Sequence, residues 1–437
     1  MFKQIMPKVL IVSRLTWDDS SNSNTLTNLF SGYPSDLIAR IYIETKKPRT
    51  NCCHRFYQIS EIALLKKLWR WNIKTGHAFD TENESYCEQK KDEATEQSMM
   101  SFVRSHRHKL FTYMRDILWS FGGWKTKELT SFIRDFNPDI IWLDGSPLIL
   151  MNRLNNYVKK VAGKPSVTFL MDDVYTYRSC PSLMDKLYKS LLRKHVMRTV
   201  KEADHVFVAS PKMKKEYDAI FGVNSTFIAK GVDYSRVSIS SSTVGTPIKM
   251  VYFGNVLIGR LQSLILIAEA IADANKKGKH VQLDIYTGDN ITVSDRKALL
   301  SCDNVRLMKP VPYNEVAGIM NESDVVVFVE ALTGKKKNIA RLSFSTKIVD
   351  YIGSGKCIFA VGPDDAAPIE YLRDNRIALV ATNKQQVYDN LMVLNKETIE
   401  DYQARVNNFG HTHHDIHHTQ QIIYDQLLEL YHQRTLQ

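Results

Sequence analysis

The amino-acid sequence predicts an α/β protein with two Rossmann-like domains, each built on a doubly wound parallel sheet. Short apolar, β-rich runs alternate with helical stretches along nearly the whole chain, as in parallel sheets covered by helices. A Ser- and Thr-rich stretch without periodicity, residues 234–247, separates two series of such runs and is typical of a linker. The length of 437 residues also exceeds what one core normally serves.

The first series predicts an N-terminal domain over residues 1–233. Its expected strands are continuously apolar, as buried parallel strands should be, and cover residues 8–12, 37–43, 139–143, 166–171, 205–209 and 225–229. Helices are expected over residues 186–202 and 212–221. The long interval between about residues 46 and 136 is interpreted as an insertion in this domain.

The second series predicts a C-terminal domain over residues 248–400. Its expected strands cover residues 248–254, 281–287, 304–308, 324–330, 357–362 and 377–382, with helices between them, for example at 261–276. Residues 401–437 form a tail in which a helix is expected from about 420 to 431.

Composition and charge restrict the classes of partner and compartment. No apolar run approaches the roughly 18–20 residues of a membrane span, and the N-terminus lacks a signal-peptide pattern. The six cysteines have no CxxC or zinc spacing, which predicts free thiols and a cytoplasmic protein. The formal charge of +11 favours anionic partners, namely nucleotide diphosphates, acidic lipid headgroups or nucleic acid, and does not choose among them.

Two basic, aromatic-rich segments within the interval 46–136 lead to a membrane hypothesis. They cover residues 64–74 and 102–125, where Lys and Arg mix with Trp, Phe and Tyr. Basic amphipathic helices that carry Trp and Phe can lie in an anionic membrane surface, which would make the protein peripheral on the inner face of the cell membrane. The other interpretation is an amphipathic helix whose apolar face packs on its own domain.

The segment 343–362 is the first candidate binding site. Ser345 and Thr346 precede a short helix, where a hydroxyl can cap the helix and the free N–H groups can hold a phosphate. Lys347 and Asp350 lie three residues apart and share one helix face. A cation beside a phosphate site and a carboxylate one turn later suit a nucleotide whose ribose hydroxyls donate to Asp350. The alternative is an ordinary capped helix.

The pattern S-T-K-x-x-D-Y-x-x-S-G-K in this segment resembles the donor-binding helix of nucleotide-sugar glycosyltransferases with the GT-B architecture. These enzymes have two facing Rossmann-like domains and a C-terminal helix that crosses back to the first. The segment is most similar to the retaining family four, whose usual form is K-x-x-E-Y-x-A-x-G-K-P. The resemblance implies that Asp350 binds the donor ribose. This chain has Asp for Glu, one methylene shorter, and Cys357 for Pro.

Other segments extend the resemblance. The loop 252–261 resembles the family element that contacts the donor diphosphate, where Gly254 permits close backbone approach and Arg260 balances the leaving-group charge. Asn255 is a further donor-binding candidate in this loop. Glu330 ends an expected strand and corresponds to the Glu near the donor sugar, although it lies twenty positions before Asp350 rather than in the usual E-x7-E spacing. Residues 201–210 and 228–234 also match, with Lys230 where the family has Asn.

Asp172 and Asp173 end an expected strand of the first domain. In similar enzymes this strand end lies near the acceptor, where a carboxylate could orient or deprotonate the acceptor hydroxyl. The alternative is a turn cap. The pair is not a D-x-D metal motif, and the resemblance implies that no metal or other cofactor is needed. A histidine cluster has helical spacing that zinc could use, but a polar helix surface is expected instead, at His411, His413, His414, His417 and His418.

The resemblance therefore implies a glycosyltransferase that moves a sugar from a nucleotide-diphosphate sugar to a hydroxyl of a glycan or lipid-linked acceptor. Retention of configuration and a role in bacterial surface polysaccharide synthesis are expected with it. The alternatives are a nucleotide-sugar epimerase, which also has two Rossmann-like domains, and a catalytically silent protein that binds sugar nucleotides or membranes. Nucleic acid is not expected as a partner.

Overall fold

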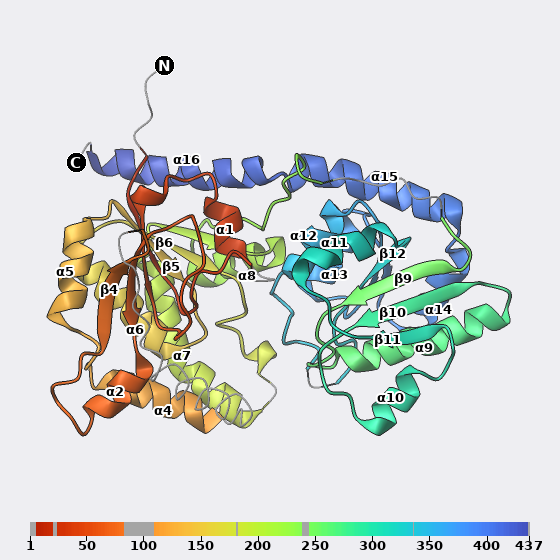
Figure 1. The fold of residues 1–437 in the computed structure, drawn as a ribbon, viewed down its shortest axis with the longest axis horizontal. Coiled ribbons are helices and arrows are strands. Elements are labelled where there is room, and N and C mark those ends of the chain that lie inside the picture. Colours follow the sequence, from red (N-terminus) through yellow and green to blue (C-terminus); the bar gives the residue numbers. More distant parts are fainter. Residues whose placement is uncertain are drawn as a thin grey trace, which may run out of the picture. The chain divides into compact units, whose positions relative to one another are not determined.

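The computed structural model describes residues 6–20, 24–82, 109–180, 182–237, 244–334 and 336–435. Parts of the expected linker (238–243) and of the basic segment 102–125 (102–108) lie outside the described residues. The chain forms two compact units (Figure 1). Unit 1 comprises Met1–Ala209, Lys214–Ile228 and Gln420–Gln437, and unit 2 comprises Ser210–Met213 and Ala229–Thr419.

Unit 1 is built on an eight-stranded sheet of order β4-β3-β2-β1-β5-β6-β7-β8. Neighbouring strands are parallel except for the antiparallel pair β3 and β4. The strands are β1 (Val9–Val12), β2 (Ile38–Tyr42), β3 (Arg55–Ile59), β4 (Gly76–Asp80), β5 (Ile140–Asp144), β6 (Ser166–Leu170), β7 (His205–Val208) and β8 (Thr226–Phe227). All six strands predicted for this domain are confirmed.

Strands β3 and β4 lie inside the interval that was interpreted as an insertion. They extend the sheet at its edge, with Tyr57 opposite Ala78 in the antiparallel pair. Strand β4 is the edge strand and β3 is its inner neighbour, and neither has the continuous apolar run of the central parallel strands. Polar residues interrupt the apolar ones in RFYQI and GHAFD, so neither sequence contains the run that predicts a buried strand.

Helices cover both faces of this sheet. They are α1 (Thr25–Phe30), α2 (Glu61–Lys67), α4 (Lys109–Ser120), α5 (Lys127–Phe136), α6 (Ile149–Ala162), α7 (Leu183–Lys201) and α8 (Pro211–Phe221), with short 3-10 turns at Ser35–Leu37 and Tyr177–Ser179. Trp119 of α4 and Trp124 are buried in the core with apolar side chains of α5 and α6. This half of segment 102–125 therefore packs on its own domain.

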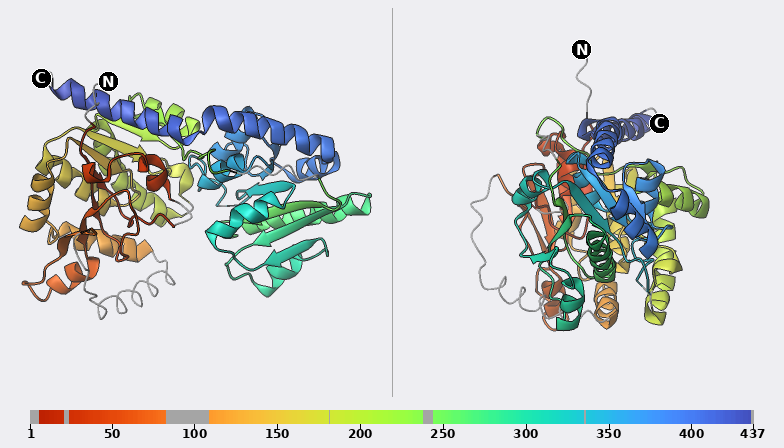
Figure 2. Two further views of the ribbon diagram at one scale, coloured as in Figure 1. Left: turned by 45° about the horizontal axis from the view of Figure 1, so that its top comes forward. Right: turned by 90° about the vertical axis from the view of Figure 1, so that its right-hand side faces the viewer.

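The C-terminal helix α16 (Ile416–Thr435) returns to unit 1 (Figure 1, Figure 2). Its Gln420 amide donates to the Asn28 carbonyl at 2.8 Å and to the Ser31 hydroxyl at 2.9 Å. The Tyr424 ring meets Tyr33 edge to face, with 5.3 Å between ring centroids. The predicted crossing-back helix is thus confirmed.

Unit 2 has a six-stranded, all-parallel sheet of order β11-β10-β9-β12-β13-β14. Its strands are β9 (Ile248–Phe253), β10 (Val281–Tyr286), β11 (Val305–Met308), β12 (Val325–Val329), β13 (Cys357–Val361) and β14 (Leu379–Ala381). Each coincides with a predicted strand. The buried patterns of β12 and β13, VVVFV and CIFAV, fit strands that are covered on both faces.

The unit 2 helices divide between the two faces of this sheet. One face packs against α9 (Arg260–Lys276), α10 (Val293–Leu299) and α14 (Lys384–Val393). The other packs against α11 (Tyr313–Asn321), α12 (Thr346–Gly353) and α13 (Ala367–Asp374), while α15 (Lys396–His413) contributes to both clusters. Among the described residues, no helix is both long and apolar enough to cross a membrane.

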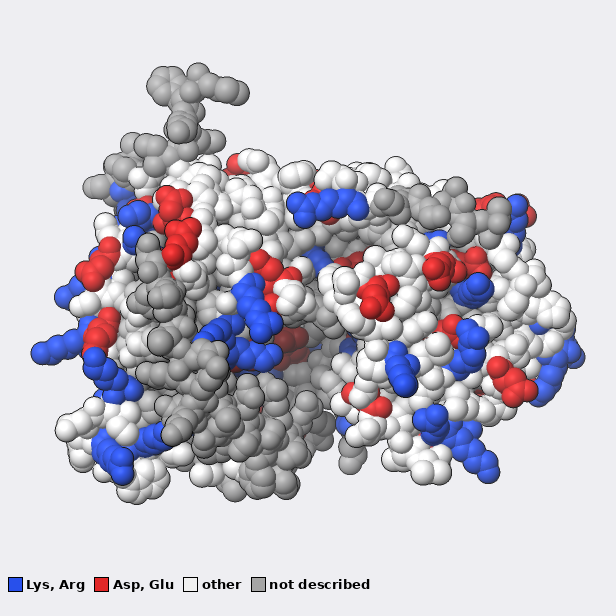
Figure 3. Space-filling view, viewed as in Figure 1, with Lys and Arg blue, Asp and Glu red and all other residues white. Residues whose placement is uncertain are grey.

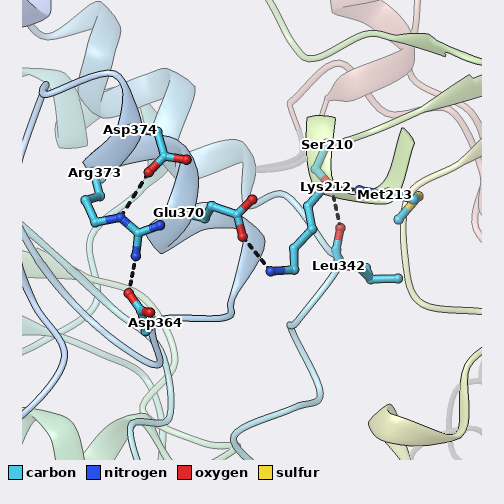
Figure 4. Close-up of polar contacts among 8 residues, drawn as sticks. All are labelled: Ser210, Lys212, Met213, Leu342, Asp364, Glu370, Arg373 and Asp374. Atoms are coloured by element: carbon cyan, nitrogen blue, oxygen red, sulfur yellow. Dashed lines mark hydrogen bonds and ion pairs between the residues drawn. The ribbon is translucent and has the colours of Figure 1, made fainter. Parts of the chain in front are cut away.

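The short segment 210–213 belongs to unit 2 through polar contacts (Figure 4). The Ser210 hydroxyl accepts from the Met213 N–H, which caps α8, and donates to the Leu342 carbonyl at 2.8 Å. Lys212 forms an ion pair with Glu370 of α13. The first turn of α8 is therefore held by the same unit as the segment that precedes α12.

The histidine cluster is not uniformly a helix surface. His411, His413, His417 and His418 are exposed, as predicted, but His414 is buried. Its Nε2 shares a 2.8 Å hydrogen bond with the Tyr371 hydroxyl, and its carbonyl accepts from the Val232 N–H at 2.6 Å. The prediction was wrong for His414 because it lies between α15 and α16, where the chain turns and packs on α13. Burial lowers the pKa of His414 to about 4.

This buried imidazole should make unit 2 sensitive to acid. In the unfolded chain His414 takes up a proton near pH 6.5, whereas the folded protein resists protonation down to about pH 4. The unfolded state therefore binds more protons between these values, and the free energy of unfolding should fall by up to about 3 kcal/mol as the pH is lowered through them. Urea unfolding at several pH values measures this slope. His414→Leu should flatten it, and the exposed-site control His418→Leu should not.

Candidate functional site

The candidate site of unit 2 lies where the strand order of its sheet reverses. Strands β9 and β12 are neighbours in the middle of the sheet, and their helical connections leave in opposite directions. Ligands of open α/β sheets bind outside the carboxyl ends of the strands at such a switch point. Gly254 follows β9 and Glu330 follows β12, so the topology brings together two residues that lie far apart in the sequence.

Arg260 is held at this edge by a buried carboxylate. Its Nε donates to Glu330 Oε2 at 3.2 Å and one Nη to Glu330 Oε1 at 2.9 Å, while the other Nη reaches the Asn255 side-chain oxygen at 2.8 Å. The side chains of Arg260 and Glu330 are only 16% and 6% exposed. Burial by itself would lower the pKa of Arg260, but Glu330 outweighs burial and raises it. The site therefore contains a firmly charged and immobilised guanidinium.

Glu330, which is predicted to lie near the donor sugar, forms an ion pair with Arg260. Both of its carboxylate oxygens are bonded to Arg260, and its carbonyl accepts from the Ser263 hydroxyl of α9 at 2.8 Å. These bonds position Arg260, and a contact of Glu330 with the donor sugar stays a prediction. A guanidinium has five N–H donors, so two remain after these three bonds for an anionic ligand.

Lys347 supplies a second cation beside Gly254. Its ammonium donates to the Phe253 carbonyl at 2.8 Å and lies 5.3 Å from the centre of the Tyr252 ring. Burial lowers the pKa of Lys347 to about 8, with the neighbouring Arg260 charge acting in the same direction. A Cβ at position 254 would overlap the Lys347 ammonium, and Gly254 has a φ of 124°. Only glycine permits this close approach.

Helix α12 begins at Thr346 but is not capped as predicted. Ser345 occupies the N-cap position, yet its side chain makes no capping hydrogen bond. The turn is closed instead by the backbone, with the Ile348 N–H donating to the Ser345 carbonyl at 3.0 Å. The prediction of a hydroxyl cap is therefore wrong at Ser345. The start of this helix still lies beside Lys347, with both Ser345 and Thr346 partly exposed.

Asp350 lies one turn further along α12 and is paired with a buried lysine. Its Oδ1 accepts from Lys230 Nζ at 2.6 Å and from the Tyr313 hydroxyl at 3.4 Å. The Lys230 side chain is 7% exposed, and that of Asp350 is 22% exposed. Burial would lower the pKa of Lys230, but Asp350 and Tyr313 outweigh burial and raise it. Within the described chain, both side-chain hydrogen bonds to Asp350 end on Oδ1, and Oδ2 accepts none of them.

Lys230 and Tyr313 were not predicted as parts of the site. Lys230 had been noted only as a departure from the family pattern, and it meets Asp350 across 120 positions of sequence. The sequence did contain a signal for this pair, because a Lys in place of Asn at position 230 and an Asp in place of Glu at position 350 are complementary in charge and in side-chain length. Tyr313 begins α11 and gave no signal.

In unit 1, the side chain of Asp173 stabilises a turn. The side chain is buried, and its oxygens accept from the Thr176 N–H at 2.8 Å, the Thr176 hydroxyl and the Tyr217 hydroxyl at 3.1 Å. These bonds close the turn after β6, so the turn-cap alternative describes Asp173. Asp172 is exposed at the same strand end.

Asp144 is a candidate that the sequence analysis missed. It ends β5, the neighbour of β1 at the switch point of the unit 1 sheet. Burial raises the pKa of Asp144 to about 6, while a backbone hydrogen bond and the charge of Arg14 oppose the rise and Asp172 adds to it. The sequence signal was its place at the end of the apolar strand beside β1. Asp144 and Asp172 thus both lie at the carboxyl edge of this sheet, at the ends of the neighbouring strands β5 and β6.

Two further observations concern metals and thiols. No group of three or more His, Cys, Asp and Glu side chains in the described residues is arranged to hold a metal ion. The described cysteines are free thiols, as predicted, at positions 52, 53, 180, 302 and 357.

Comparison with solved structures identifies the fold. No protein-family model matches the chain, and no curated protein matches its sequence. An α,α-trehalose-6-phosphate synthase from Burkholderia multivorans superposes with a TM-score of 0.60 at 11% identity, over 99% of this chain and 98% of that one. The chain has the GT-B fold.

Two other GT-B structures extend the comparison to nucleotide complexes. The trehalose-6-phosphate enzyme from E. coli, solved with UDP-2-fluoro glucose, superposes with a TM-score of 0.57 at 9% identity, over 96% of this chain and 98% of that one. TarM of S. aureus, solved with UDP, gives 0.50 at 14% identity over 69% of this chain and 58% of that one. At these identities the likeness concerns the fold.

Proposed function

We propose that the protein is a glycosyltransferase whose donor is a nucleotide-diphosphate sugar bound in unit 2. One observation carries the proposal: two cations, Arg260 and Lys347, lie at the switch point of a GT-B sheet beside Gly254. A diphosphate bears the complementary charge, and the backbone at Gly254 lets it come close. The UDP and UDP-sugar complexes of fold neighbours support this choice of ligand.

The residues of the site have distinct parts in this proposal. Arg260 and Lys347 bind the diphosphate and stabilise the negative charge that develops as the sugar departs. Glu330 positions Arg260. Asp350 accepts from a ribose hydroxyl through Oδ2, since Lys230 occupies Oδ1. Asn255 and the backbone around Ser345 and Thr346 complete the donor pocket.

The acceptor half of the proposal rests on unit 1. Asp144 and Asp172 present two carboxylates that can orient an acceptor hydroxyl. We propose a hydroxyl of a glycan or lipid-linked glycan of the bacterial surface as acceptor, and retention of configuration, because the α12 segment resembles retaining family four. Arg260 and Lys347 provide the charge that neutralises the leaving diphosphate, so no metal cofactor is part of the proposal.

A donor screen tests the function. The full chain is titrated with UDP-, GDP- and dTDP-sugars in a thermal-shift assay, because a ligand that binds the native state raises the melting temperature. Bound donors are then incubated with and without a panel of glycan acceptors, in buffer that contains EDTA. Transfer of the sugar, seen by mass spectrometry, with a retained anomeric signal by NMR, is the expected result. Interconversion of the donor without acceptor would indicate an epimerase, and binding without turnover a silent protein.

The same assay separates donor binding in unit 2 from the proposed role of unit 1. Asp144→Asn should leave the donor-induced shift unchanged and lower transfer at least tenfold, because the donor is proposed to bind unit 2 and the carboxylate of Asp144 in unit 1 is proposed to orient the acceptor. Asp135→Asn, an exposed site on α5, is the matched control. Wild-type transfer by Asp144→Asn would remove this residue from the proposal.

A further inference from the structure

An exposed apolar face lies at one end of unit 1. Helix α7 carries three leucines spaced four residues apart, Leu183, Leu187 and Leu191, which are 72%, 52% and 53% exposed. This spacing places them on one side of the helix. An isolated exposed leucine is ordinary, but a stripe of three over two turns needs a partner.

Helix α4 presents a second stripe of the same kind. Met114 and Ile117 of this helix and Phe121, the residue directly after it, are exposed at intervals of three and four residues, while Trp119 of α4 is buried. The Tyr113 hydroxyl of α4 bonds to the Met184 carbonyl of α7, and the Tyr113 ring packs edge to face on Tyr188. The two stripes therefore belong to helices in direct contact.

The residues that follow α2 add two tryptophans to this end of the unit. Trp69 and Trp71 are 74% and 86% exposed. Helix α2 is fixed to α4 by the two-pronged bond of Arg115 to Glu61 and by the Lys67 contact with the Gly123 carbonyl. All three helices lie at the same end of unit 1 (Figure 1, Figure 2).

The acidic and the basic side chains of these helices lie in different places. Their acids point inward: Glu61 binds Arg115, Asp116 accepts from Tyr188 and the Leu150 N–H, and Asp185 closes the capping box of α7. Their exposed charges are basic, at Lys66, Arg70, Lys74, Lys125, Lys186 and Lys194. Lys and Arg side chains are visible over the α2 end of unit 1 in Figure 3.

We infer that this face, formed by 65–74 with the outer sides of α4 and α7, docks on an anionic lipid bilayer. Apolar stripes buried in the acyl boundary, tryptophans at headgroup level and a rim of Lys and Arg are the properties that a negatively charged bilayer selects. A second copy of the chain is the poorer occupant, because two such faces would bring like charges together. The stripe on α7 lies outside both segments from which the sequence predicted membrane contact.

The inference does not depend on the donor site, because its test needs no donor. Full-length protein is sedimented with vesicles of phosphatidylcholine alone and with vesicles that contain phosphatidylglycerol. Binding should require the anionic lipid. It should fall at least tenfold in Trp69→Ala/Trp71→Ala and in Leu183→Asp/Leu187→Asp, and about fivefold for each of Lys186→Gln and Lys194→Gln. The control is Val293→Asp, at an 87% exposed valine of unit 2.

Since all these positions are exposed, the variants should keep the wild-type melting temperature, which confirms that they fold. Equal sedimentation of wild type and face variants would overturn the inference, as would equal binding to neutral vesicles. A dimer in sedimentation velocity that the same substitutions abolish would assign the face to a second copy. Vesicle binding that appears only after residues 83–108 are removed would assign the face to that segment of the chain instead of a bilayer, and would overturn the inference.

Discussion

Arg260→Ala is expected to lower kcat by about 10²- to 10³-fold, the usual effect of removing a donor aimed at developing charge. The guanidinium is immobilised by Glu330 and Asn255 before any ligand arrives, so it needs no reorganisation as the diphosphate departs. Its contact should strengthen as the leaving group gains charge, and the loss should therefore appear in kcat more than in donor affinity. Steady-state kinetics with the donor found by the screen measures both.

The substitution also leaves Glu330 buried without its cation, which would destabilise the fold by itself. Arg260→Ala/Glu330→Gln removes both charges and provides the control for this effect. If the double variant recovers stability in urea unfolding and stays slow, the kinetic loss belongs to Arg260. If it recovers turnover, the ion pair is structural and the diphosphate contact is wrong.

The sequence predicted the central strands of each sheet because a buried parallel strand requires a continuous run of apolar residues. VVVFV of β12 and CIFAV of β13 are five-residue apolar runs rich in β-branched and aromatic residues, as expected of buried parallel strands. Strand β3 and the edge strand β4 were not predicted, because polar residues interrupt the apolar ones in RFYQI and GHAFD. Edge strands are specified by their pairing, which a single sequence does not display.

Individual site residues were predictable only where they belong to a local motif. Gly254, Arg260 and Lys347 come together because strand ends and helix starts converge, and this follows from the fold once the strands are known. The ion pair between Glu330 and Arg260 forms only in the tertiary structure, and no local motif predicts it. Asp173 shows the same limit, because a carboxylate after a strand can close a turn or serve a ligand, and only its partners decide.

The Lys230–Asp350 pair joins two departures from the family pattern into one feature. An aspartate is one methylene shorter than the usual glutamate, and the long lysine side chain reaches it from position 230 with 2.6 Å between the atoms. The lysine ammonium is buried and needs an anion, whereas the more exposed carboxylate retains Oδ2 for a ligand. The pair therefore joins stability to donor binding.

Single and double substitutions should separate these two effects. Asp350→Ala leaves the Lys230 ammonium buried and unpaired, and the free energy of unfolding should fall by about 3 kcal/mol, the lower end for a broken buried pair because Asp350 is partly exposed. Lys230→Met should also destabilise, since Asp350 loses its cation. The double variant Lys230→Met/Asp350→Ala should recover most of the loss. Arg306→Met, which breaks a more exposed ion pair with Asp284 in the same unit, should cost less than about 1 kcal/mol.

The three variants should rank differently in donor affinity than in stability. It should fall about 10- to 100-fold in both variants that lack Asp350, the effect of losing a hydrogen bond to a charged group, and stay near wild type in Lys230→Met. Titration calorimetry with the identified donor measures it below the melting temperature of each variant. If donor affinity follows stability across all three variants, Asp350 serves only to pair with Lys230, and the proposed hydrogen bond to the donor ribose is wrong. Affinity lost only where Asp350 is lost assigns its free oxygen to the donor, because Lys230→Met removes the pair and keeps the carboxylate.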